Sequence, residues 1–91
     1  ALIGSTGLVG CAIKQVLKRL DIDTLFLTHK NFEITNIEDY NVIKDFGADV
    51  AINTAAYLGV EPCEKDPVEA FKINVIAVRD LARFCDNYSV C

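Results

Sequence analysis

Basic residues and long apolar runs are both scarce in this sequence. Nine lysines and arginines stand against thirteen aspartates and glutamates, so the net charge is −4. This balance excludes the basic surface that binds nucleic acids or anionic membranes. No apolar run approaches the roughly twenty residues of a membrane-spanning helix. Hydrophobic residues make up 52% of the chain and charged residues 24%, which excludes an intrinsically disordered protein.

Paired metal ligands are also missing. The four cysteines form no C-x-x-C pair, and the only histidine, His29, is distant in sequence from all of them. Zinc sites need ligands at short paired spacings, so the sequence predicts no metal site. Cys11 and Cys85 fall in apolar stripes of predicted helices, where cysteine behaves as a small hydrophobe. We therefore expect buried, reduced thiols, as in a cytoplasmic protein.

Strands and helices alternate along the chain. Short apolar runs at residues 1–3, 24–28 and 49–53 predict buried strands, and residues 88–91 resemble the start of another. The order β-α-β-α-β-α-β predicts an α/β fold with a Rossmann-like, doubly wound parallel sheet. Because the chain lacks an initiator methionine and its two ends resemble partial strands, we interpret residues 1–91 as the N-terminal portion of a larger domain, truncated at both ends.

Three helices are predicted between these strands. Apolar residues at helical spacing predict the first over residues 8–20. Thr35 and Glu38 form a capping box that begins the second, which Gly47 ends. Asp66 is the N-cap of the third, which extends to about Asp86. The apolar stripe predicted for this third helix consists of Phe71, Val75, Val78, Ala82 and Cys85.

A glycine-rich turn joins the first strand to the first helix, with the sequence Gly-Ser-Thr-Gly-Leu-Val-Gly over residues 4–10. Gly4 allows a tight turn, Gly7 lets the backbone approach a pyrophosphate, and Gly10 lets the helix pack against the strand. The start of the helix then directs N–H groups at the phosphates. The turn therefore predicts dinucleotide binding. No Lys-Ser/Thr pair follows it, which excludes a Walker-type loop.

The end of the second strand indicates which dinucleotide is bound. An acid at this place bonds the ribose 2′-hydroxyl of NADH, but here the residues are Thr28, His29 and Lys30. None of them repels a 2′-phosphate. The predicted cofactor is NADPH or NADH, with NADPH favoured; a solvated loop is the alternative interpretation of these residues.

The glycine spacing resembles the extended short-chain dehydrogenase/reductase superfamily, and three further stretches resemble its dTDP-4-dehydrorhamnose reductase family. These are Glu-Ile-Thr-Asn at residues 33–36, Asn-Thr-Ala-Ala-Tyr at residues 53–57, and the approach to the third helix at residues 60–74. The resemblance covers essentially the whole chain. It implies an NAD(P)H-dependent reductase of a nucleotide-linked 4-keto sugar, with the sugar nucleotide bound by a C-terminal lobe absent from these residues.

The resemblance also implies roles for individual residues. From the residues alone, the two alanines could equally be core, the tyrosine after them a boundary aromatic, and Asn74 either a structural hydrogen-bonding residue or a support for catalysis. The implied cofactor-binding residues are Gly4 and Gly10, which shape the turn, Gly7, Leu8 and Val9 at the pyrophosphate, Thr28 at the adenosine ribose, Glu33 and Ile34 at the adenine, and Ala55, Ala56 and Tyr57 along the middle of the cofactor.

A Tyr-x-x-x-Lys pair carries the chemistry of this superfamily, because the ammonium lowers the pKa of the phenol. Tyr40 and Lys44 have this spacing, but they precede the strand that the family's pair follows. We interpret them as a chance match and expect the catalytic residues beyond Cys91. The 91 residues alone are then expected to show no turnover.

Two other functions remain open from the sequence. The regulatory subunit of methionine adenosyltransferase is similar across the same motifs and is a non-catalytic binding subunit. Sugar-nucleotide epimerases and 4,6-dehydratases belong to the same superfamily but usually have a longer segment after the second strand. Only four residues separate Thr28 from Glu33, which favours the reductase. A homodimer is also left open.

Overall fold

Three short parallel strands form the centre of the computed structural model, which describes residues 1–56 and 60–91. The first, β1 (Leu2–Ile3), lies between β2 (Phe26–Leu27) and β3 (Ile52–Asn53). Both of its neighbours run parallel to it. The chain therefore crosses over one face of the sheet to reach β2 and over the other face to reach β3.

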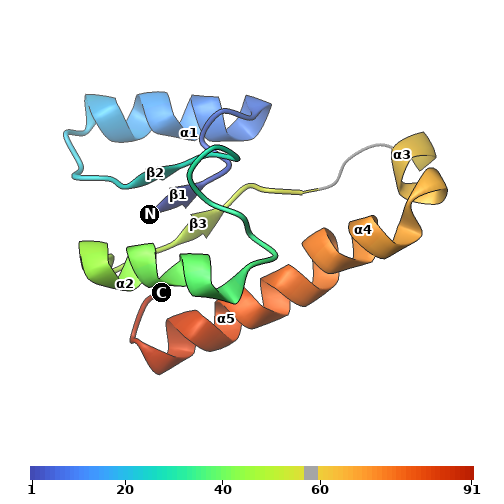
Figure 1. Cartoon of the computed structure of the whole chain (residues 1–91). Coiled ribbons are helices and arrows are strands. Elements are labelled where there is room, and N and C mark those ends of the chain that lie inside the picture. Colours follow the sequence, from blue (N-terminus) through green and yellow to red (C-terminus); the bar gives the residue numbers. More distant parts are fainter. Residues whose placement is uncertain (57–59) are drawn as a thin grey trace.

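Helices cover both faces of this sheet. Helix α1 (Leu8–Arg19) lies on one side, and α2 (Asn41–Phe46) and α5 (Ala77–Asn87) lie on the other (Figure 1). The predicted doubly wound parallel sheet is therefore confirmed. No helix in the described part of the chain has both the length and the apolar character needed to cross a membrane.

The strands are shorter than predicted, although backbone pairing continues beyond them. The amide of Leu2 donates to the carbonyl of Leu25 at 2.9 Å, one residue before β2 begins. Near β3, the amide of Cys91 donates to Asp49 and its carbonyl accepts from Ala51, both at 2.8 Å. Of the strand predicted at residues 88–91, Cys91 is thus the residue that pairs with a neighbouring segment in the pattern of parallel strands.

The second helical region begins differently from the prediction. The capping box is wrong, because the Thr35 hydroxyl donates to the carboxylate of Glu33 at 2.9 Å. The Asn36 side chain is the cap instead, and it accepts from the amide of Glu38 at 3.2 Å. A 3₁₀ turn (Ile37–Tyr40) follows and continues into α2. Gly47 ends α2 in the left-handed conformation with φ of 76°, as predicted.

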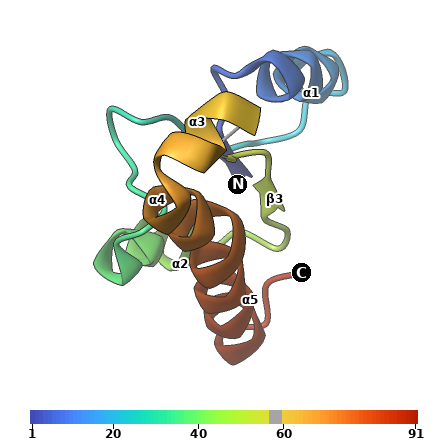
Figure 2. The ribbon, with the colours of Figure 1, turned by 90° about the vertical axis from the view of Figure 1, so that its right-hand side faces the viewer.

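The third predicted helix is confirmed, but one of its turns is π-helical rather than α-helical. Asp66 caps it, accepting from the amide of Glu69 at 3.1 Å. The helix consists of α4 (Pro67–Phe71), a π-helical turn (Lys72–Ile76) and α5, which form one continuous rod (Figure 2). A short helix that the sequence did not predict, α3 (Val60–Lys65), precedes it.

The buried stripe of this rod is not the predicted one. Of the five predicted members, Phe71, Val75 and Val78 are each about half exposed, Ala82 is exposed and Cys85 is buried, so the prediction is wrong for all but Cys85. The rod carries two adjacent apolar stripes, and the sheet covers the other. Its buried members belong to the apolar core, which consists of Ile3, Leu27, Phe32, Ile34, Tyr40, Ile43, Ala77, Leu81, Phe84, Cys85 and Val90.

The two cysteines singled out above differ in their surroundings. Cys85 is a buried free thiol, as expected, and burial raises its pKa. Cys11 is a free thiol but exposed, so its predicted burial is wrong. On that turn of α1, Gly10 is the residue that faces the sheet, and the Cys11 thiol lies 3.5 Å from the carbonyl oxygen of Ser5.

We predict that the isolated 91-residue chain self-associates. Apolar side chains remain exposed on both sides of the sheet, and apolar surface of this extent favours association. Sedimentation velocity over a range of concentrations is expected to show oligomers, with a thermal transition that depends on concentration. A monomer with a sharp, concentration-independent transition would contradict the prediction. The exposed side chains in question are Val16, Leu20, Ile22, Val68, Phe71, Val75 and Val78.

Candidate functional site

The candidate site is the glycine turn between β1 and α1, at the carboxyl end of the sheet. Gly4 turns the chain out of β1 with φ of 79°, a conformation that side chains disfavour. A Cβ at this position would lie 2.6 Å from the hydroxyl oxygen of Thr54. Gly4 is therefore required both by its backbone conformation and by the close approach of the segment after β3.

Gly10 is required for a different reason. It is buried in the first turns of α1, and a Cβ there would lie 1.9 Å from the carbonyl oxygen of Gly4. No side chain can occupy that space, because the obstacle is backbone. The absence of a Cβ thus allows α1 to pack directly against the turn, which is the role that the sequence predicts.

No contact among the described residues explains in a comparable way why position 7 is a glycine. Its φ of −73° suits any residue, and the nearest atom to a Cβ would be the Gly4 carbonyl oxygen at 3.4 Å. Among the described residues, packing therefore does not demand a glycine at this exposed position. A ligand that lies against the backbone would demand it.

The beginning of α1 adds hydrogen-bond donors to this exposed position. The first amides of a helix lack intrahelical acceptors. The Gly7 amide donates to the Gly4 carbonyl at 3.0 Å, and among the described residues no side chain caps the helix, so the amides of Leu8 and Val9 have no intrahelical acceptor. No acidic residue lies in the first turn, and Lys18 and Arg19 lie in the last. The helix dipole and these donors together favour an anion here.

Two hydroxyl side chains that the sequence analysis missed hold the turn in place. The Thr54 hydroxyl lies 2.7 Å from the carbonyl oxygen of Ile3 and 3.2 Å from that of Gly4. The Ser5 hydroxyl is fully buried and donates to the carbonyl of Leu27 at 3.2 Å. Both residues follow closely after the end of a strand. A small hydroxyl residue at such a place is the sequence signal that could have identified them.

A small pocket of about 20 Å³ adjoins the turn at the carboxyl ends of the strands. Of the predicted cofactor residues, it brings together Gly4, Thr28, Ile34 and Ala55. The sequence analysis missed Phe32, an aromatic residue within a polar loop, which also lines it. The full lining of this carboxyl-end pocket is Ile3, Gly4, Leu27, Thr28, His29, Phe32, Ile34 and Ala55.

The loop after β2 forms a tight, polar turn at the rim of this pocket. The amide of Thr28 donates to the side-chain oxygen of Asn31 at 2.7 Å. The Thr28 hydroxyl accepts from the amide of Lys30 at 3.2 Å. The side chains of His29 and Lys30 are exposed. The rim therefore presents a hydroxyl, an imidazole and an ammonium.

Several predicted residues are not brought into the pocket. The Glu33 carboxylate accepts from the hydroxyl and amide of Thr35, and its side chain is exposed. Ala56 is exposed, and Tyr57 lies outside the described residues. Asn74 is exposed within the π-helical turn and is not part of the pocket lining. The roles assigned to these four residues stay predictions.

Tyr40 and Lys44 do not form a proton-transfer pair. Tyr40 is fully buried, and its hydroxyl donates to the carbonyl of Ile34 at 2.6 Å. The Lys44 ammonium lies instead over the ring of Tyr88, 5.2 Å from its centroid. Burial raises the pKa of Tyr40 to about 12, so the phenol stays protonated at neutral pH. The geometry gives Tyr40 a structural place in the core.

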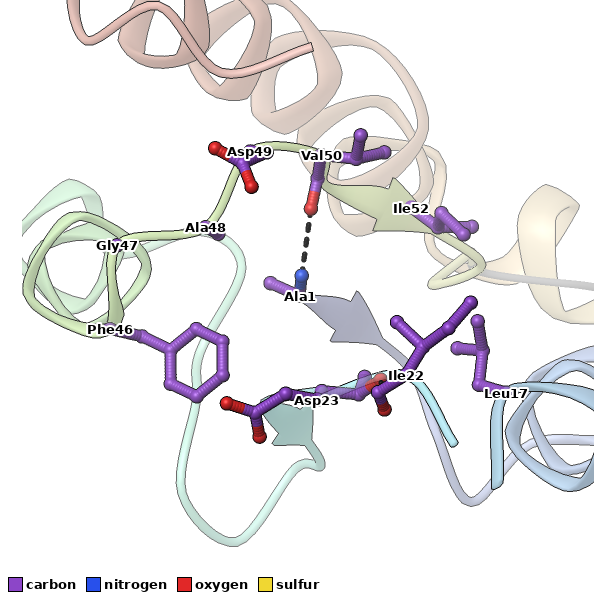
Figure 3. Close-up of a pocket in the computed structure, with 11 residues that line it drawn as sticks. Ala1, Leu17, Ile22, Asp23, Phe46, Gly47, Ala48, Asp49, Val50 and Ile52 are labelled. Carbon is purple, nitrogen blue, oxygen red and sulfur yellow. Dashed lines mark hydrogen bonds between the residues drawn. The ribbon is translucent and has the colours of Figure 1, made fainter. Parts of the chain in front are cut away.

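A larger cavity of about 450 Å³ lies at the opposite, amino end of the sheet (Figure 3). Leu17, Ile22, Phe46 and Ile52 contribute apolar side chains to it, and the backbone nitrogen of Ala1 donates to the carbonyl of Val50 at 2.7 Å. Ligands of open α/β sheets bind at the carboxyl ends of the strands. We therefore place the candidate site at the glycine turn despite the smaller volume there. Within the described residues, no three potential metal ligands come together.

Comparison with protein families places this geometry among known proteins. A model of the family described as RmlD substrate binding domain matches residues 1–91. The dTDP-4-dehydrorhamnose reductase of Sinorhizobium fredii is 32% identical over 83 residues, which cover 90% of this chain and 28% of the relative. The chain thus spans less than a third of the length of this relative.

Solved structures agree with this match. A crystal structure of dTDP-4-dehydrorhamnose reductase from Bacillus anthracis in complex with NADP superimposes with a TM-score of 0.89. Its sequence identity is 27%, over 98% of this chain and 32% of that one. UDP-glucose 4-epimerase of Thermus thermophilus, solved with NAD, shares the fold with a TM-score of 0.85 at 19% identity over 98% of this chain and 34% of its own.

Substitution of Gly10 by alanine is expected to destabilise the full-length protein, because the added Cβ must displace backbone. Overpacking of this kind costs about 1–3 kcal/mol or more of unfolding free energy. Gly7→Ala is the matched control and is expected to cost less than about 1 kcal/mol, since alanine is only a poorer N-cap. Urea denaturation measures both. Equal stability of the two variants would contradict the packing role of Gly10.

Proposed function

The chain belongs to the RmlD substrate binding domain family, and from this premise we propose that it forms the dinucleotide-binding part of a sugar-nucleotide reductase. The proposed reaction is the NAD(P)H-dependent reduction of a nucleotide-linked 4-keto sugar. Residues 1–91 would be the N-terminal portion of the Rossmann domain. The catalytic Tyr-x-x-x-Lys pair and the sugar-binding lobe would belong to a part of the protein outside these residues.

The observation that supports this proposal most is that the three glycines of the turn are needed for different reasons. The fold itself requires Gly4 and Gly10, since a Cβ at either would collide with neighbouring atoms. Gly7 is exposed and has free space around it, at the place where the first amides of α1 have no intrahelical acceptor. A pyrophosphate lying against the Gly7 backbone would use both the space and the amides. The residues present therefore fit a dinucleotide.

In this proposal, the turn and the carboxyl-end pocket bind different parts of the cofactor. The amides of Leu8 and Val9 would bind the pyrophosphate. Thr28 would lie at the adenosine ribose and Ile34 at the adenine, while Ala55 would border the central part. When bound, the cofactor would supply the hydride for the reduction. These 91 residues would bind and orient it and would not transfer the proton.

We further propose that NADPH is preferred to NADH. The rim of the pocket carries Thr28, His29 and Lys30, without a carboxylate that would repel a 2′-phosphate. The Thr28 hydroxyl already accepts from the Lys30 amide, which orders the turn before any ligand is bound. The Bacillus anthracis relative, solved with NADP, is consistent with this preference.

The proposal is tested on the full-length protein with NADPH and a dTDP-linked 4-keto sugar. Loss of NADPH absorbance that depends on the sugar would support the reductase. Binding of NADPH without turnover would favour the alternative of a non-catalytic binding subunit. Absence of NADPH and NADH binding would reject the dinucleotide site.

Gly7→Ala is expected to weaken NADPH binding by about tenfold or more, equivalent to about 1.4 kcal/mol, because the methyl group occupies space needed by the pyrophosphate. Isothermal titration calorimetry measures the change. Gly47→Ala is the control: this glycine has φ of 76° and borders the cavity at the opposite end of the sheet. That variant is expected to lose stability but to keep its affinity. Unchanged affinity of Gly7→Ala would place the pyrophosphate elsewhere.

Thr28→Asp is expected to reverse the cofactor preference. A carboxylate at the rim would repel a 2′-phosphate and bond a 2′-hydroxyl, so the Kd for NADPH should rise about tenfold while that for NADH does not rise. Thr28→Asn, similar in shape but uncharged, is the matched control and should keep the preference for NADPH. If Thr28→Asp leaves the ratio of the two Kd values unchanged, the ribose does not lie at Thr28.

A further inference from the structure

One wall of the carboxyl-end pocket has no regular secondary structure of its own. We call residues 29–34 the loop wall; it contributes His29, Phe32 and Ile34 to the pocket lining. Phe32 and Ile34 are buried, with exposed fractions of 5% and 6%. Local hydrogen bonds hold part of this backbone: the amide of Phe32 donates to the carbonyl of Thr28 at 3.0 Å, and the amide of Glu33 donates to the carboxylate of Asp39 at 2.8 Å. Contacts with the core must add to these bonds at the two buried side chains.

Tyr40 provides such contacts at both buried residues of the wall. Its hydroxyl donates to the carbonyl oxygen of Ile34 at 2.6 Å, the shorter of its two hydrogen-bonding contacts. Its ring stacks on the ring of Phe32, with centroids 5.8 Å apart and planes inclined by 18°. One side chain therefore contacts the backbone of one wall residue and the side chain of the other.

The same tyrosine also anchors the wall to helix α5. The Tyr40 ring packs edge-on against Phe84 at a centroid distance of 5.6 Å. Its hydroxyl lies 3.4 Å from the carbonyl oxygen of Ala77 at the start of α5. Tyr40 itself has no exposed surface and does not line the pocket. It can therefore influence a ligand only through the position of the loop wall.

We infer that Tyr40 is a positioning residue for the cofactor: its hydroxyl, through the bond to the Ile34 carbonyl, holds the loop wall against the adenosine half of the dinucleotide. This inference rests on the proposed function. The hydroxyl remains a donor throughout the physiological pH range, because burial holds its pKa near 12. Tyr40, the tyrosine of the chance Tyr-x-x-x-Lys match, thus acts in binding rather than in proton transfer.

The test is Tyr40→Phe in the full-length protein, which removes the hydroxyl and keeps the ring. We expect the Kd of adenosine 2′,5′-bisphosphate and the KM for NADPH to rise by the same factor, about tenfold. The kcat at saturating NADPH should not change, because the residues that react lie elsewhere. Tyr88→Phe removes a hydroxyl from an exposed tyrosine on the same cluster and should change none of these values.

A second control separates positioning from general stability. Phe84→Leu removes the edge contact of Tyr40 with α5 but keeps the hydroxyl and its bond to Ile34. This variant is expected to lower Tm and to weaken the affinity for adenosine 2′,5′-bisphosphate less than Tyr40→Phe does, because the bond to the Ile34 carbonyl remains. If Tyr40→Phe lowers only Tm, or if both variants weaken binding equally, the positioning role is overturned.

The outcomes also distinguish this inference from the proposed function. If the wild-type protein binds neither NADPH nor adenosine 2′,5′-bisphosphate, the proposed function fails. If it binds both and Tyr40→Phe binds them equally well, only the positioning role fails. Should Tyr40→Phe not fold, hydrogen exchange of the wild-type protein decides: the amides of residues 32–36 must gain protection with adenosine 2′,5′-bisphosphate, and no gain would overturn the inference.

Discussion

The close approach of helix α1 to the end of strand β1 is the constraint on which the rest of this structure depends. A Cβ at Gly10 would lie 1.9 Å from the Gly4 carbonyl oxygen, so the contact requires a glycine at position 10. It fixes the start of α1 at the carboxyl end of the sheet. The amides at the start of the helix and the adjacent strand ends are thereby brought to one edge, where a dinucleotide is expected to bind.

The other half of the site depends on tertiary packing instead. The loop after β2 gains its shape from the Thr28–Asn31 turn and from an aromatic cluster that reaches α5 through Tyr40. These contacts join residues that are far apart in the sequence, and Tyr40 and Ala77 are 37 positions apart. The contact between α1 and the glycine turn thus joins residues that are close in the sequence, whereas the loop after β2 requires the folded core.

This division explains what could be predicted from the sequence. The glycine turn was predictable, because the spacing of its three glycines within seven consecutive residues is itself the signal, although the atoms that exclude a Cβ at Gly4 belong to Thr54 and Ala55. The cap at Asn36 was not, because Thr35 and Asn36 are adjacent residues of similar capping ability and the choice depends on Glu33 occupying the threonine hydroxyl. The buried stripe of the long helix was misjudged for a similar reason, since both of its apolar stripes satisfy the same periodicity.

Phe32 was missed, and Tyr40 was noticed only as part of a chance Tyr-x-x-x-Lys match, because nothing in the local sequence indicates the contacts that they make in the core. An aromatic residue in a polar loop and a tyrosine in a 3₁₀ turn acquire their roles only when the α5 side of the core is in place. By contrast, the side chains of His29 and Lys30 at the rim are exposed and contribute little to that core. The exposed residues at the rim can therefore change without disturbing the fold, whereas the buried residues of the loop cannot. The two groups follow one another within a dozen residues, so a close sequence match in this region carries information about the fold and much less about a ligand at the rim.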